Sequence, residues 1–281
     1  MIRLFYFILS HSFFIALCAT ALSFQTGQLT GISTNPYLLS FIFFGTLSGY
    51  NAYWLISKFS FSSSNSFRLL ISSSRISLFV FIMALVGMLF CYLQLNLFSS
   101  SLSIAGGLFI FYLLPILPFK NLCWIKRWGF LKTVLLAFTW TIVTTLIPLQ
   151  VPIWGMEPLV TLVFIHRLLF MMLLCIIFDK RDAAIDKIRG LQSMATFLNP
   201  LKLHFLIGFI FISYLIVNYF MKAYGIGMAH LISLSLIGLI ALIMYIFSLQ
   251  KRGYLFYYFG VDGLMFFSAI MTWLSVYFKF K

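Results

Sequence analysis

Apolar stretches of membrane-spanning length recur along the whole chain, separated by short polar segments. A transmembrane helix needs about 20 mostly apolar residues, and nine stretches meet that requirement. They lie at 4–24, 36–57, 76–97, 101–118, 131–149, 158–178, 203–221, 227–248 and 254–277. The pattern predicts an all-α, polytopic membrane protein with nine transmembrane helices. Because no segment between them is long enough for a soluble domain, we expect residues 1–281 to form a single transmembrane domain.

Composition supports a membrane protein. The chain is 63% hydrophobic and 9% charged, whereas a soluble domain is about one quarter charged. The first stretch also resembles a signal peptide, with Arg3, an apolar run and the small residues "CATALS". We expect it to be a retained helix, because its removal would leave eight spans and place the C-terminus on the basic side.

Basic residues gather on one side of the predicted topology. With nine spans, the N-terminus and every second loop share a side, and that side holds most of the 19 Lys and Arg residues. By the positive-inside rule this side, which includes the N-terminus and the loop after the sixth span, is cytoplasmic. We therefore expect a multi-pass protein of the cell inner membrane. The net charge of +14 then reflects topology and attraction to anionic membrane lipids, not nucleic-acid binding.

Three of the five acidic residues occur within the stretch "FDKRDAAIDKIRGLQS". Asp179, Asp182 and Asp186 are spaced by three and four, which on a helix puts all three carboxylates on one face. Such a face suits Mg²⁺, which is held by one or two carboxylates together with phosphate oxygens. The alternative is a juxtamembrane loop in which these aspartates pair with interleaved bases such as Arg181 and Lys187.

This stretch resembles the second aspartate-rich motif of the UbiA-type intramembrane prenyltransferases, which reads approximately N/D-D-x-x-D-x-x-x-D-x-x-x-G-x-x-T/S. The residues in matching places are Asp179, Arg181, Asp182, Asp186, Gly190 and Ser193. Nine helices, with acidic motifs after the second and sixth on the cytoplasmic side, is also the architecture of that family. The resemblance thus implies a UbiA-like bundle over nearly the whole chain. It further implies Mg²⁺-dependent transfer of an isoprenyl group from its diphosphate to a lipophilic acceptor.

The resemblance also assigns roles within this motif. Asp182 and Asp186 would be the catalytic Mg²⁺ ligands, and Asp179 would be a further ligand. Arg181 and Lys187 would contact the diphosphate of the donor.

The first motif of that family is degenerate in this chain. Its pattern, N-D-x-x-D-x-x-x-D, falls on "NAYWLISKF", where Asn51 matches the leading Asn. Ala52, Leu55 and Phe59 stand where the three aspartates would be. One metal-binding half is therefore missing. Only Asn51 remains there, either to contact the diphosphate or Mg²⁺ or to form a hydrogen bond between helices.

Two functions remain open on this fold. In the first, the protein is an enzyme that uses one Mg²⁺, while bases such as Lys120 and Arg127 take over part of the diphosphate charge. In the second, the protein is a catalytically inactive homologue that binds another lipid-like ligand or acts as a scaffold.

Two charges fall inside predicted spans. Arg167 lies in the middle of the sixth span and Asp262 lies in the ninth at a similar depth. Because an isolated charge in the bilayer is costly, we expect Arg167 and Asp262 to form a buried ion pair. If both instead line a polar route, the protein would be a small-molecule transporter.

Overall fold

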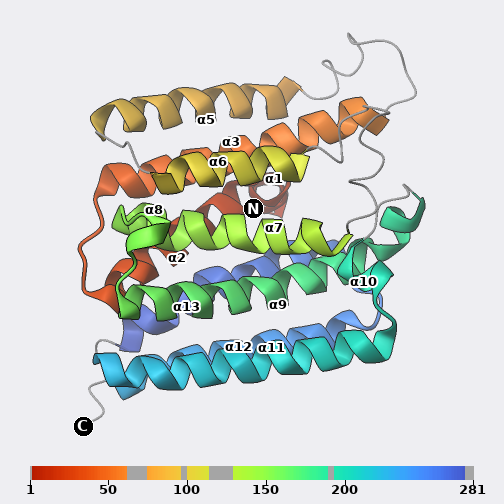
Figure 1. Cartoon of the computed structure of the whole chain (residues 1–281). Coiled ribbons are helices and arrows are strands. Elements are labelled where there is room, and N and C mark those ends of the chain that lie inside the picture. Colours follow the sequence, from red (N-terminus) through yellow and green to blue (C-terminus); the bar gives the residue numbers. More distant parts are fainter. Residues whose placement is uncertain (1, 62–74, 96–99, 114–128, 189–192, 276–281) are drawn as a thin grey trace.

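The computed structural model describes residues 2–61, 75–95, 100–113, 129–188 and 193–275. Within these ranges the regular structure is entirely helical, which confirms the predicted all-α class. The long helices run roughly parallel or antiparallel to one another in a bundle (Figure 1). Lys120, Arg127 and Gly190 lie outside the described residues.

The first part of the chain runs from inside the bundle, where α2 packs, to an edge formed by α5. Its helices are α1 (Ile2–Ser10), α2 (Phe13–Thr30), α3 (Pro36–Phe61), α5 (Arg75–Gln94) and α6 (Ser100–Leu113). The predicted first span is therefore two helices, and Ser12 between them has the left-handed φ of 66°. Helix α3 packs between α2 and α5.

The remainder of the chain supplies the longest described helix, α9, and two π-helical segments. Its elements are α7 (Gly129–Thr141), the π-helix η4 (Ile142–Leu146), α8 (Ile147–Leu149), η5 (Ile153–Gly155), α9 (Pro158–Ile188), α10 (Met194–Phe197), α11 (Pro200–Met221), η6 (Lys222–Tyr224), α12 (Met228–Ser248), the π-helix η7 (Phe256–Val261) and α13 (Asp262–Ser275). Helix α9 packs against α7, α11 and α12, so it lies inside the bundle.

The first and last parts of the chain meet through helices α2 and α13. Gln25 on α2 donates hydrogen bonds to the Ser268 carbonyl (3.0 Å), the Ser268 hydroxyl (2.9 Å) and the Thr272 hydroxyl (2.7 Å) on α13. An amide that is buried in this way holds two apolar helices in one register. The bundle is thereby closed between its N-terminal and C-terminal helices.

Six of the described helical stretches are long and apolar enough to cross a membrane. They are Phe13–Thr30, Arg75–Gln94, Leu131–Leu149, Pro158–Ile188, Pro200–Tyr224 and Met228–Ser248. Large apolar side chains are exposed along α5 and α11, including Phe79, Leu93, Leu201, Phe205 and Phe209. Exposed apolar surface of this extent suits lipid as the surrounding medium. The chain is therefore an integral, multi-pass membrane protein, while the number of nine crossings stays a prediction.

Candidate functional site

The last turns of helix α9 carry the three aspartates. The helix continues without a break to Ile188, so these residues lie on a helix and not in a loop. Asp179 and Asp186 are buried and Asp182 is half-buried. We call this end of the bundle, which also contains α10 and the beginning of α7, the aspartate end (Figure 1).

Asp179 joins three helices. Its Oδ2 atom accepts hydrogen bonds from the Thr133 hydroxyl on α7 (2.5 Å) and from the backbone N–H of Met194 on α10 (3.1 Å). Ser193 and Thr196 complete a capping box at the start of α10. The Asp179 carboxylate is thus engaged in holding α7, α9 and α10 together.

Asp186 faces a lysine from a different helix. The Lys132 ammonium on α7 lies 3.7 Å from Asp186 Oδ2. That oxygen is buried and has no hydrogen-bond partner among the described residues. The distance exceeds that of a hydrogen bond, so Asp186 Oδ2 retains capacity to bind another donor or a cation.

Asp182 is paired with its neighbour in the sequence. Arg181 donates to both carboxylate oxygens of Asp182, at 2.7 Å from Nε and 2.8 Å from Nη2. The guanidinium carbon also lies 4.8 Å from the ring centres of Phe178 and Tyr258, and 5.5 Å from that of Tyr257. These rings hold the cation in place, and Arg181 Nη1 is buried without a hydrogen-bond partner.

The side chains at the aspartate end fit one way of holding the Mg²⁺ that the resemblance implied, and they do not fit another. The described residues contain no group of three or more His, Cys, Asp or Glu side chains that could hold a metal ion. Mg²⁺ is commonly held by only one or two carboxylates when phosphate oxygens complete its shell. The Oδ2 atom of Asp186, which accepts no hydrogen bond although it is ion-paired with Lys132, and Asp182 one turn away fit a single ion of this kind. A cage made of protein ligands alone does not fit.

Two solved structures resemble this chain over almost its full length. The first is the apo structure of a UbiA homologue from Aeropyrum pernix K1, with a TM-score of 0.58, 12% identity, and coverage of 95% of this chain and 98% of that one. The second is a digeranylgeranylglyceryl phosphate synthase, with a TM-score of 0.56, 14% identity, and coverage of 98% and 97%. The chain has the UbiA fold.

The UbiA fold confirms the UbiA-like bundle that the resemblance implied, and the count of nine helices stays a prediction. No protein-family model and no curated protein matches the sequence itself. At 12% and 14% identity, the likeness concerns the fold, and chemistry must be argued from the residues.

Asn51, the remnant of the first motif, lies on α3 with its side chain inside the bundle. It is 2% exposed. Its Nδ2 atom donates to the backbone carbonyls of Leu47 (2.8 Å) and His11 (3.1 Å). His11 precedes the left-handed Ser12, so Asn51 satisfies a carbonyl at the break between α1 and α2. Contact with a diphosphate remains a prediction.

The predicted ion pair between Arg167 and Asp262 is wrong. Arg167 is buried, and its Nη2 atom donates to the Leu22 carbonyl (3.3 Å) and the Thr26 hydroxyl (3.2 Å) on α2. Asp262 lies instead within electrostatic range of Arg181, near the aspartate end. The depth estimate failed because α9 continues beyond the predicted end of the span. The π-helix η7 before Asp262 also advances less per residue than an α-helix.

The structure adds residues that sequence patterns did not single out. Lys132 and Thr133 contact the motif from α7, about 50 positions earlier in the chain. The positive-inside rule already accounts for a lysine at position 132, so nothing in the sequence identified Lys132 as a site residue. Lys187, predicted to contact the diphosphate, is exposed on the last turn of α9.

Proposed function

We propose that this protein is a UbiA-type prenyltransferase with a reduced, one-metal diphosphate site. The observation that supports this most is the meeting of Asp186, Asp182, Lys132 and Arg181 at the aspartate end. Lys132 on α7 faces Asp186 on α9, and Arg181 pairs with Asp182 one turn earlier on α9. The Oδ2 atom of Asp186 is buried and accepts no hydrogen bond among the described residues. Such a mixed set suits a ligand that brings both phosphate oxygens and a divalent cation.

Asp186 and Asp182 would hold the Mg²⁺, which when bound neutralises charge on the leaving diphosphate. Lys132 would bind a phosphate oxygen as a point charge, in place of the missing first motif. Arg181 would offer its unpaired Nη1 to a second phosphate oxygen while Phe178, Tyr257 and Tyr258 keep the guanidinium in position. These positive groups stabilise the charge that develops as the donor ionises.

The reaction balances without a redox partner. The allylic C–O bond of the isoprenyl diphosphate breaks, and its electron pair leaves with the diphosphate. The lipophilic acceptor then forms a bond to the allylic carbon and loses a proton. The aromatic faces of Tyr257 and Tyr258 near the site would shield the allylic carbocation from water.

A second candidate is a catalytically inactive protein that binds an isoprenoid diphosphate or a similar lipid. Two observations favour it. Ala52 and Leu55 offer no ligand atom where the first motif would have aspartates. In addition, Asp182 is already neutralised by a bidentate pair with Arg181, which a metal would have to displace.

One experiment separates these candidates. The purified protein is incubated with isoprenyl diphosphates of increasing chain length, a membrane lipid extract as the source of acceptor, and Mg²⁺. Binding of the diphosphate and release of inorganic diphosphate are measured in parallel. A transferase releases diphosphate only with Mg²⁺, and Asp186→Asn lowers the rate by about 10²-fold or more.

The matched control is Lys202→Gln, since Lys202 is exposed at the beginning of α11 at the same end of the bundle. It should leave the rate unchanged. Binding without release would support the inactive candidate, and the absence of both would exclude the two proposals together.

A further inference from the structure

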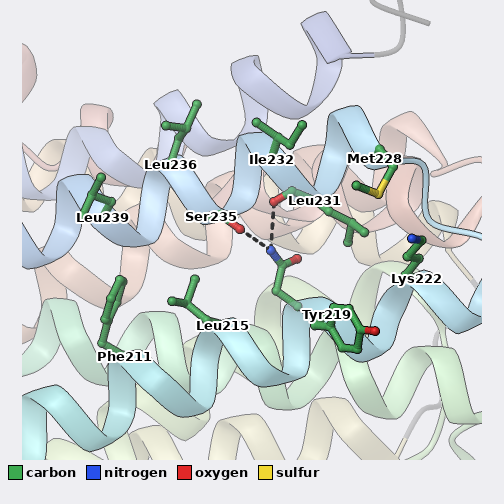
Figure 2. A pocket seen from close by; sticks show the side chains of 11 residues that line it. Phe211, Leu215, Tyr219, Lys222, Met228, Leu231, Ile232, Ser235, Leu236 and Leu239 are labelled. Atoms are coloured by element: carbon green, nitrogen blue, oxygen red, sulfur yellow. Dashed lines mark hydrogen bonds between the residues drawn. The ribbon is translucent and has the colours of Figure 1, made fainter. Parts of the chain in front are cut away.

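A groove opens between helices α11 and α12, at the end of the bundle opposite the aspartate end. Its volume is about 670 Å³. Apolar side chains from both helices form its walls, among them Phe211, Leu215, Leu231, Leu236 and Leu239 (Figure 2). Several of these project outward, and Leu236 and Leu239 are 44% and 45% exposed. The groove therefore faces the surrounding membrane and not the interior of the bundle.

One polar residue inside the groove fixes the distance between its two walls. Asn218 on α11 donates from Nδ2 to the Leu231 carbonyl and to the Ser235 hydroxyl on α12, both at 2.8 Å (Figure 2). Hydrogen bonds between helices in an apolar medium hold a defined spacing. The groove is thus a formed feature of the helix pair.

The mouth of the groove carries a positive charge. Lys222 follows the end of α11 and lines the groove together with Tyr219 (Figure 2). Within the described ranges, Lys222 is the only Lys or Arg residue at this end of the bundle. A lysine and a tyrosine at the end of an apolar groove are typical of the depth at which lipid headgroups lie, where such side chains are enriched.

The dimensions of the groove match one leaflet of a bilayer. From Phe211 to Lys222, α11 advances about 16 Å, which is about half of a 30 Å hydrocarbon core. An acyl chain lying along this length would place its phosphate beside the Lys222 ammonium, which binds phosphate as a point charge.

We propose that this groove is a binding site for one anionic glycerophospholipid. The acyl chain lies between α11 and α12, and the phosphate pairs with Lys222. The site is separate from the aspartate end and does not rest on prenyl transfer.

The test uses phosphatidylglycerol with a photoreactive diazirine near the end of one acyl chain. The protein is reconstituted in phosphatidylcholine containing a few per cent of this probe, irradiated and digested. Cross-links should concentrate on Phe211, Leu236 and Leu239. Lys222→Gln should weaken retention of phosphatidylglycerol by about fivefold in native mass spectrometry, which corresponds to one exposed ion pair.

Lys251→Gln is the matched control, because Lys251 is exposed between α12 and η7 at the other end of the bundle. It should not change retention. Cross-links spread evenly over α5 and α11 would overturn the proposal. Equal retention of phosphatidylcholine and phosphatidylglycerol by the parent protein would do so as well.

Discussion

Asn51 donates two hydrogen bonds from its side-chain amide within the bundle, to Leu47 and His11. The sequence identified it as the survivor of a ligand-binding motif, whereas its contacts are those of a residue that stabilises the break between α1 and α2. Substitution of Asn51 should have an effect in either role. A ligand-binding role predicts a loss of diphosphate binding, whereas a structural role predicts a loss of stability.

We expect Asn51→Leu to lower the free energy of unfolding by about 1–3 kcal/mol, since the half-buried His11 carbonyl loses its partner. Thermal unfolding in detergent checks this. Ser48→Ala is the control, because the Ser48 hydroxyl donates to the Gly45 carbonyl of its own helix. Unchanged thermal stability together with lost diphosphate binding would instead assign Asn51 to the ligand.

Arg167 shows how a buried cation can be held without a carboxylate. Its contacts are the Leu22 carbonyl and the Thr26 hydroxyl, and the Thr26 hydroxyl in turn donates to the Thr144 carbonyl in the π-helix η4 (2.7 Å). A backbone carbonyl and a hydroxyl of α2 therefore take the place of the counter-ion that a sequence argument would demand.

A double-mutant cycle tests this account. Thr26→Val and Arg167→Met should be coupled by about 0.5–3 kcal/mol in thermal unfolding, because the two side chains share a hydrogen bond. Asp262→Asn and Arg167→Met should be additive. Strong coupling between Arg167 and Asp262 would restore the ion pair that the structure does not contain.

At the scale of elements, helices α11 and α12 approach closely at Gly238. A Cβ atom added there would overlap the ring of Tyr214. Tyr214 stacks on His166, with ring centres 4.1 Å apart, and donates to the Leu234 carbonyl at 2.7 Å. The absence of a side chain at Gly238 thus allows α9, α11 and α12 to pack around one ring.

Gly238→Ala should destabilise the protein by about 1–3 kcal/mol, because the Tyr214 ring must move in a packed interior. Gly208→Ala is the matched control on α11, since nothing lies within 4 Å of an added Cβ there. The two variants are compared by thermal unfolding. Equal melting temperatures would contradict the close packing at Gly238.

At the scale of the whole molecule, the hydropathy pattern predicted most of the architecture. Helix ends such as those of 228–248 and 200–221 agree with the predicted spans to within a few residues, because the length of an apolar run is set by the bilayer. The break at Ser12 and the π-helix η4 were not predictable, since both lie at hydrogen bonds between helices that are distant in the sequence. The π-helix η7 was not predicted either.

The candidate site was only half visible in the sequence. The spacing of Asp179, Asp182 and Asp186 correctly indicated a helical face. Their partners Lys132 and Thr133 come from another helix, and which side chains meet across helices depends on packing that a single sequence does not encode locally.

The orientation of the bundle in the membrane is a separate prediction. Lys222 and Lys251 lie at opposite ends of the bundle, and each is replaced by cysteine in turn. The background carries Cys123→Ser, and the native Cys18, Cys91 and Cys175 are buried. A membrane-impermeant maleimide should label Lys222→Cys in intact cells. It should label Lys251→Cys only after permeabilisation, because the basic end is expected to be cytoplasmic. The reverse pattern would invert the topology.

Helix α9 has 31 residues and is therefore about 46 Å long, whereas the hydrocarbon core of a bilayer is about 30 Å thick. A helix of this length projects beyond the hydrocarbon at one or both ends, and its polar last turns, with Asp182 and Asp186, are the part suited to do so. An amphipathic molecule with a charged headgroup and an apolar tail could then reach these residues by lateral diffusion within the leaflet. During the approach its headgroup would stay hydrated and its tail would stay in the hydrocarbon core. The approach would therefore need neither desolvation of the headgroup nor a soluble carrier protein for the tail.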